Sequence, residues 1–129
     1  TKLIPLATAL YDAEERYRLA NGDYTTDLES LDISLPPNPI SCTRTATRAH
    51  CTYDWGRAGV TDGPTNVHVL LAGNRIAYMR FFKPLASISA QKGDIFCFAK
   101  PDDNIANKTC RSLGGTYVTS GSTWIYYRL

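Results

Sequence analysis

Four cysteines are the residues whose chemistry the sequence shows most directly. They stand at positions 42, 51, 97 and 110, and four cysteines allow three pairings. The sequential pairing, Cys42 with Cys51 and Cys97 with Cys110, closes two short loops and needs no long-range coincidence. Neither pair has the C-x-x-C spacing of zinc or thioredoxin sites. We therefore expect two disulfides, and a protein that matures in an oxidising compartment.

Residues for nucleophilic or acid–base catalysis are scarce. The chain has two histidines, His50 and His68, and no HExxH, GxSxG, Walker or GxGxxG motif. His50 stands beside Cys51, but that cysteine has an expected disulfide partner. His68 falls in an alternating segment, which is typical of a residue on the solvent face or the edge of a sheet. The sequence therefore predicts a protein that is not an enzyme.

An acidic cluster between the last two cysteines is the one candidate for a metal site. Asp102, Asp103 and Asn104 could offer oxygen ligands to calcium. The cluster lacks the remaining ligands of an EF-hand loop, and a capped helix over residues 105–113 is the favoured interpretation. Asp102 and Asp103 stay candidates for calcium, but we predict neither a metal nor a cofactor.

Three arginines gather around the first cysteine pair. Arg44, Arg48 and Arg57 could form a shallow basic patch that binds DNA or a glycan, aided by nearby aromatic rings. The alternative, and the favoured one, is a solvated loop. A net charge of +2 and a pI near 8.4 are too mild to indicate a nucleic-acid or membrane partner by bulk electrostatics.

The N-terminal segment is expected to form one amphipathic helix over residues 4–20. Asn21-Gly22 then supplies a stop signal. Asp12–Arg16 and Glu14–Arg18 are acid-first pairs that we expect on its exposed side. A stripe with alternating intervals of three and four residues forms the apolar face of this helix. Its members are Leu3, Leu6, Leu10, Ala13, Tyr17 and Ala20.

The rest of the chain reads as a loop followed by a sheet. Tyr24, Leu28, Leu31 and Ile33 are expected to hold a loop against the helix. Strands are expected at 53–55, 95–99 and 124–129, with a hairpin of 67–71 and 76–81 turning at Gly73-Asn74. The 129 residues then form a single domain. Its parts are a helix at 1–21, a connecting loop region at 22–66, and an antiparallel sheet with a C-terminal disulfide loop at 67–129.

The predicted fold class is therefore α+β: a long N-terminal amphipathic helix packed on an antiparallel sheet of about four strands, with disulfide-bounded loops. No run of eighteen apolar residues occurs, so the printed chain is not expected to span a bilayer.

Two long segments resemble type IV pilins and pseudopilins. "AEERYRLANGDYTTDLESLDI" (13–33) is similar to the end of the spine helix and the segment that follows it in that family. "GDIFCFAKPDDNIANKTCRSLGG" (93–115) resembles the C-terminal cysteine-bounded loop, and "STWIYYRL" (122–129) resembles the closing strand. The order and spacing of the segments carry the resemblance more than any one of them.

The resemblance implies a pilin-like soluble head that lacks the leader and the apolar N-terminal half of the spine helix. Its partners would be copies of itself in a helical filament and the pilus assembly machinery, with DNA or a host surface as further candidates. Contact with the membrane would occur only through the missing half of the helix. The location would be a bacterial pilus, or fimbrium, reached through the inner membrane and periplasm.

The implied role is a structural subunit that serves assembly, adhesion, motility or DNA uptake. A type II secretion pseudopilin and a pilus-displayed minor pilin that binds DNA or glycan remain as alternatives. In this family's bacterial setting the glycosylation sequon at 107–109 is expected to be fortuitous.

Overall fold

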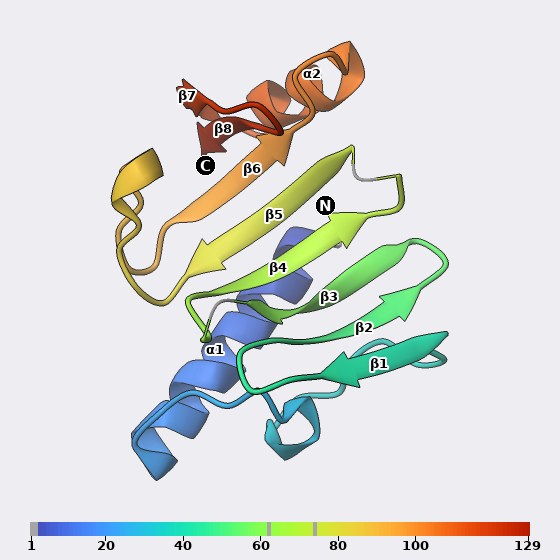
Figure 1. Ribbon diagram of the computed structural model, residues 1–129, viewed down its shortest axis with the longest axis vertical. Helices are drawn as coiled ribbons and strands as arrows, with labels where there is room; N and C mark the ends of the chain where they lie inside the picture. The colour runs from blue at the N-terminus through green and yellow to red at the C-terminus, as the bar shows by residue number, and fades with distance from the viewer. Residues whose placement is uncertain (1–2, 62, 74) are drawn as a thin grey trace.

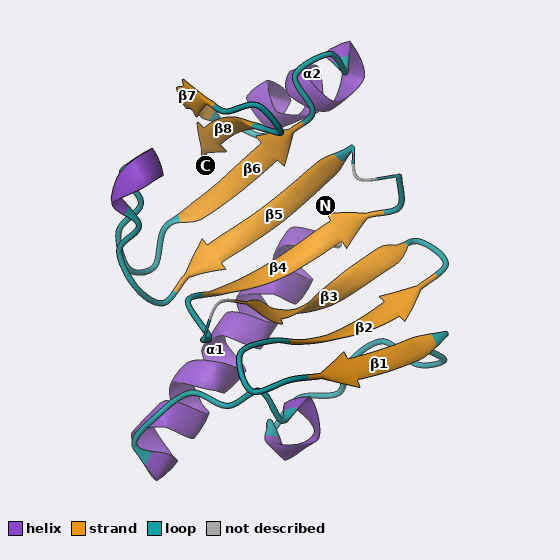
Figure 2. Cartoon of the chain, in the orientation of Figure 1, coloured by secondary structure: helices purple, strands orange, loops and turns teal. Residues whose placement is uncertain are grey.

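The computed structural model describes residues 3–61, 63–73 and 75–129, which form one eight-stranded antiparallel sheet with a long helix on one face (Figure 1). Strands make up most of the ordered structure (Figure 2). Their order across the sheet is β1-β2-β3-β4-β5-β6-β8-β7, so only the last two depart from chain order. The strands are β1 (Ser41–Arg44), β2 (Ala49–Tyr53), β3 (Gly56–Thr61), β4 (Asn66–Leu71), β5 (Ile76–Phe81), β6 (Ile95–Ala99), β7 (Thr116–Ser120) and β8 (Ile125–Arg128).

The prediction of a four-stranded, pilin-like α+β fold is wrong, because eight strands pair in the described part of the chain. Four of them match expected segments. β4 and β5 form the expected hairpin, and β6 and β8 match the strands expected at 95–99 and 124–129. Gly73 has the positive φ of +84° that suits the hairpin turn, whereas Asn74 lies outside the described residues. The other four strands have no counterpart in the sequence-based expectation.

Three of the unexpected strands, β1 to β3, lie in the segment 22–66 that was predicted to be a connecting loop region. β1 is an edge strand with all four residues exposed, so no apolar alternation marks it. β3 carries two glycines; Gly56 has a φ of +146°, and a Cβ there would strike the backbone of Leu70. The segment 53–55, expected to be a strand, instead ends β2 and turns into β3.

Helix α1 (Leu3–Asn21) matches the helix expected over residues 4–20. It ends where the Asn-Gly pair predicts, because Gly22 has a φ of +93° and its amide donates to the carbonyl of Arg18 across 2.7 Å. The signal that ends this helix is therefore local.

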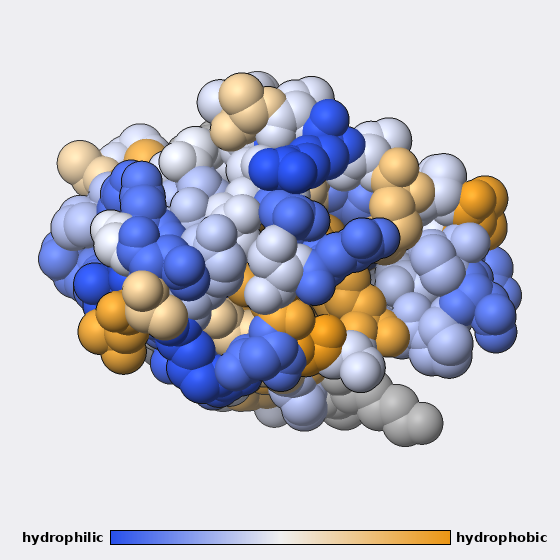
Figure 3. Space-filling view, turned by 90° about the horizontal axis from the view of Figure 1, so that it is seen from below, coloured by the Kyte–Doolittle hydropathy of each residue, from blue (hydrophilic) through white to orange (hydrophobic). Residues whose placement is uncertain are grey.

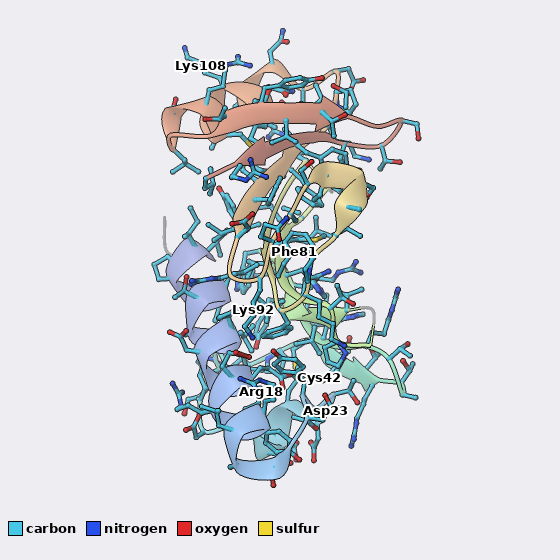
Figure 4. All side chains as sticks on the ribbon, turned by 90° about the vertical axis from the view of Figure 1, so that its left-hand side faces the viewer. Arg18, Asp23, Cys42, Phe81, Lys92 and Lys108 are labelled. Carbon is cyan, nitrogen blue, oxygen red and sulfur yellow. A yellow bond between two sulfur atoms is a disulfide. The ribbon has the colours of Figure 1, made fainter. Side chains whose placement is uncertain are left out.

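The main core lies between α1 and one face of the sheet, as the side view shows (Figure 4). Small residues on both sides, Ala7 on the helix and Ala58 on β3, let the two layers approach closely. Burying a side chain such as Leu10 contributes about 1.5–3 kcal/mol. The expected stripe packs here as far as Tyr17: Leu10 and Ala13 are buried, and Leu3, Leu6 and Tyr17 are partly buried against the same cluster. Its last member, Ala20, is exposed.

The loop after α1 folds back onto this core as expected. Leu31 is buried, and the ring of Tyr24 stacks on Phe82 with 4.2 Å between centroids. Arg16 forms two 2.8 Å hydrogen bonds to Asp32 of this loop, in place of the expected pair within the helix. The loop thus closes over the C-terminal half of α1.

Glu14 departs from its expected place on the exposed side of α1. It is completely buried, its Oε1 accepts from the Thr25 amide at 2.9 Å, and its Oε2 has no partner within the described residues. Burial raises the pKa of the Glu14 carboxyl to about 7, because the Thr25 amide replaces only part of the water that the charged form loses. Arg18 pairs with Glu15 instead, at 3.2 Å.

The opposite face of the sheet is covered unevenly. Over β5, β6 and β8 it carries an aromatic cluster, in which Phe81 meets Phe96 edge to face at 5.7 Å and Phe98 meets Tyr126 at 4.7 Å. Ile88, from a short 3₁₀ turn (Ala86–Ile88), packs on that cluster. Over β2 to β4, no helix of the described chain crosses this face, which looks toward the viewer in Figure 1.

Candidate functional site

The three arginines of the predicted basic patch do not stay together. Arg44 pairs in register with Ala49, which belongs to the core under α1, so Arg44 lies on the helix face of the sheet. There its Nε donates to Thr26 Oγ1 at 3.1 Å. Arg48 and Arg57 instead line a hollow on the open face. The structure therefore keeps two of the three arginines in one site.

We call this site the open-face hollow. It has a volume of about 160 Å³. Strands β2 to β5 form its floor, and Trp124, next to β8, adds a wall. Because the floor belongs to adjacent hydrogen-bonded strands, its side chains are held on a rigid base. The lining residues are Arg48, His50, Arg57, Thr61, His68, Leu70, Ala77, Met79 and Trp124.

His68 is the most deeply placed polar residue of the hollow, with 5% of its surface exposed. Its Nδ1 lies 2.7 Å from Thr61 Oγ1, and its Nε2 has no partner in the described part of the chain. Burial, together with the positive charge of Arg57, lowers the pKa of His68 to about 3. The ring is therefore neutral at physiological pH, with one nitrogen as donor and the other as acceptor.

His50 stands beside His68 on the same face. The rings meet edge to face at 6.1 Å, and Gly59 separates the two residues in the strand register. A side chain does not fit at Gly59, because its Cβ would come within 2.7 Å of His50 Cβ. Burial lowers the pKa of His50, and the charges of Arg57 and Arg48 add to this effect. The missing side chain thus leaves room between the two rings.

The hollow has an excess of positive charge and of donors. No carboxylate of the described residues lies within 4.0 Å of Arg48 or Arg57, and the buried Nε of Arg57 has no partner among them. A buried donor without an acceptor costs about 1–3 kcal/mol. Guanidinium groups repel metal cations and attract carboxylates and phosphates. The chemistry that suits this site is the binding of an anion.

Of the acidic pair, Asp103 is held by structural contacts. Asp103 caps helix α2 (Asn104–Ser112) by accepting from the Ala106 amide at 3.0 Å, which confirms the favoured interpretation. Arg75 also bonds Asp103 at 2.6 and 3.2 Å, and this contact, with the amide, holds the pKa of the Asp103 carboxyl down at about 2. Asp102 lies exposed in the preceding turn. Within the described residues, no three acidic, histidine or cysteine side chains are grouped for a metal.

The sequon asparagine serves the fold. Asn107 is buried, donates to the carbonyls of Lys100 and Asp103, and accepts from the hydroxyl of Tyr127 at 2.6 Å. This side chain is not accessible for attachment of a glycan.

Both expected disulfides form. Cys42–Cys51 joins directly paired positions of β1 and β2 and holds the exposed edge strand on the sheet. Cys97–Cys110 joins β6 to α2, with both cysteines fully buried. Each bridge stabilises the fold by about 2–4 kcal/mol, chiefly by restricting the unfolded chain.

Sequence reasoning did not identify His68 as a site residue. The expectation of a solvent-facing or edge histidine is wrong, since β4 is a central strand and His68 is buried. The sequence did contain a local signal for the face on which His68 lies. His68 stands between Val67 and Val69, which both pack under α1, so its side chain points to the other face. The burial of His68 also depends on the neighbouring strand β3, which was not predicted from the sequence.

Comparison with models of known protein families, with curated proteins and with solved structures finds no match to this chain. Neither helix in the described residues is both long and apolar enough to cross a membrane.

Proposed function

We propose that the chain is the head of a structural subunit of a type IV pilus or a related extracellular filament. The observation that carries the proposal is α1, an unbroken helix of 19 residues with one side on the sheet and the other in solvent. A helix anchored in this way can pack against copies of itself without disturbing the head. The resemblance of segments 13–33 and 93–115 to pilins supports the same role.

The solvent side of α1 is the surface proposed for assembly. We call it the exposed ridge: Pro5, Asp12, Arg16 and Leu19, all exposed and at helical spacing. Leu19 is 75% exposed and is the large apolar residue of the ridge. At the end of the molecule seen in Figure 3, hydrophobic residues form several separate groups among hydrophilic ones. A head-to-tail contact that uses the exposed ridge repeatedly produces an open filament.

The two disulfides support a location outside the cytosol. Disulfides persist in the periplasm, at cell surfaces and outside cells, where reductants are scarce. We propose the bacterial cell surface, reached through the inner membrane and periplasm.

A substitution on the exposed ridge tests the proposal. We expect Leu19→Glu to abolish filaments in cells that express the complete gene, because it places a charge in the packed helix interface. Ile40→Glu is the matched control, since Ile40 is 71% exposed but lies beside β1, away from α1. Immunogold electron microscopy counts the filaments. Equal filament numbers for both variants and the wild type would count against assembly through this ridge.

The gene upstream of Thr1 supplies a second test. The proposal requires an apolar helical segment preceded by a cleavable leader. A reading frame without both removes the filament role. A type II secretion pseudopilin is the alternative within this class, and labelled filaments outside the cell distinguish the pilus from it.

The open-face hollow favours a second candidate function, a pilus-displayed module that binds DNA or glycan. Two arginines without acidic partners among the described residues line a cavity on an uncovered face. DNA held through these arginines would bind with an affinity that falls steeply with added salt. Absence of binding at low salt would remove DNA as the ligand.

A further inference from the structure

We propose that the open-face hollow binds the carboxylate of a ligand whose body is a six-membered ring. Arg48, Arg57 and the Nε2 of His68 are the groups that hold the carboxylate. The inference goes beyond the second candidate function, because its ligand class includes aromatic acids as well as the acidic sugars of glycans. It does not depend on filament assembly, because the isolated chain contains every residue of the site.

Hydrogen-bond accounting is the first argument. Burial keeps the His68 ring neutral, so one ring nitrogen carries a proton. When the Thr61 hydroxyl donates to Nδ1 across their 2.7 Å contact, the proton resides on Nε2, which has no acceptor in the described chain. The Nε of Arg57 is a second buried donor without an acceptor there. The proposal places one anionic group where it accepts from both donors.

Charge is the second argument. Arg48 and Arg57 line the hollow without a carboxylate partner among the described residues, and Lys100 adds a cation over the Trp124 ring, 5.1 Å from its centroid. A planar carboxylate matches the fork of a guanidinium group and forms charge-assisted bonds with it.

Size and shape are the third argument. A cavity of about 150 Å³ holds a benzene molecule, and the hollow has a volume of about 160 Å³. Besides His50 and Thr61, its remaining walls are apolar: Leu70, Ala77, Met79 and the ring of Trp124. Apolar walls beside a cationic end suit a ring that carries one carboxylate. Two sources share this chemistry, namely an aromatic acid and a sugar acid of the uronate type.

Titration of the purified chain, followed by NMR, tests the inference. The ligands are benzoate, glucuronate and inorganic phosphate, with benzamide as the neutral analogue of benzoate. We expect benzoate, glucuronate or both to shift the indole signal of Trp124 with a Kd of about 1 mM or lower. The signal of Trp55 is an internal control, because that ring stacks on Tyr53 at 4.9 Å and does not line the hollow. Benzamide is expected to bind about tenfold more weakly or worse.

Paired variants assign the contact. Arg48→Gln changes an exposed residue and leaves the core intact, so we expect the chain to fold and to lose about tenfold in affinity for the carboxylate ligands. Arg44→Gln removes the same charge on the helix face and is expected to bind as the wild type does. Binding by only one of the two acids would support the proposal and identify the source.

Four results would overturn it: no Trp124 shift with either acid, equal binding of benzamide, phosphate binding as tight as that of the acids, or equal losses in the two arginine variants.

Discussion

The two faces of the sheet differ in how their polar groups are treated. Under α1, aliphatic and small residues from β2 to β4 meet the helix, and the one buried acid, Glu14, receives a hydrogen bond from Thr25. On the open face over the same strands, His68 and Arg57 keep buried nitrogens without partners in the described chain. Glu14 Oε2 also lacks a partner there, so the two faces differ in access: α1 covers Glu14, whereas His68 and Arg57 line a hollow on the open face.

The difference also separates the two proposals. The filament role depends on the outer side of α1, and the ligand site depends on the far side of the sheet (Figures 1 and 4). A variant on one side is expected to leave the other intact, because the sheet lies between them.

The largest expected effect comes from a core truncation on the helix face. Leu10→Ala should lower the free energy of unfolding by about 2–5 kcal/mol, because Leu10 is fully buried and its removal leaves a cavity. Leu70→Ala, at a partly buried position in the wall of the hollow, should cost about 1 kcal/mol. Urea denaturation measures both. Equal losses would contradict the contrast between the faces.

The next effect concerns the buried acid under α1. The pKa of Glu14 rises from 4.5 to about 7 on folding, so the folded state holds a proton that the unfolded state releases. Stability contributed by this group is complete below pH 4.5 and falls by about 3 kcal/mol as pH rises to 7. Glu14→Gln keeps the acceptor for Thr25 and should remove this decline.

Urea denaturation of both proteins across that pH range isolates the contribution of Glu14, since the other titrating groups are common to the two. Parallel stability curves for the two proteins would show that Glu14 does not titrate in this way.

The smallest effect, over the pH range in which it is measured, concerns the histidine of the open face. The pKa of His68 falls from 6.5 to about 3 on folding, so its stabilisation is complete above pH 6.5 and is lost as pH falls toward 3. The slope is at most about 1.4 kcal/mol per pH unit. His68→Gln should be less sensitive to acid than the wild type between about pH 6 and about pH 4.5.

Some acid sensitivity should remain in this variant, because burial, Arg57 and Arg48 also lower the pKa of His50. An unchanged slope would mean that His68 is not buried as a neutral ring.

Local features were predictable from the sequence. The helix over residues 4–20, its glycine stop, the loop that folds back through Leu31 and both disulfide pairs follow from spacing within short segments. The hairpin of β4 and β5 was predictable because its two strands alternate and a glycine lies at the turn.

Strands that lack an apolar alternation were not predictable, although β1 to β4 pair in chain order and β7 pairs with β8. β1 and β7 are edge strands with mostly exposed residues, and β3 is rich in glycine, so none of them shows an apolar alternation. The missed strands changed the fold from the expected four-stranded sheet to one of eight strands. The burial of His68 was missed for the same reason.

The sequence by itself determined the helix, its end, the hairpin and the disulfide pairs, because each depends on residues close together in the chain. Only the tertiary structure decided which side of the sheet each arginine occupies and which donors lack a partner. Those properties follow from strand register, in which a shift of one residue moves every side chain to the opposite face.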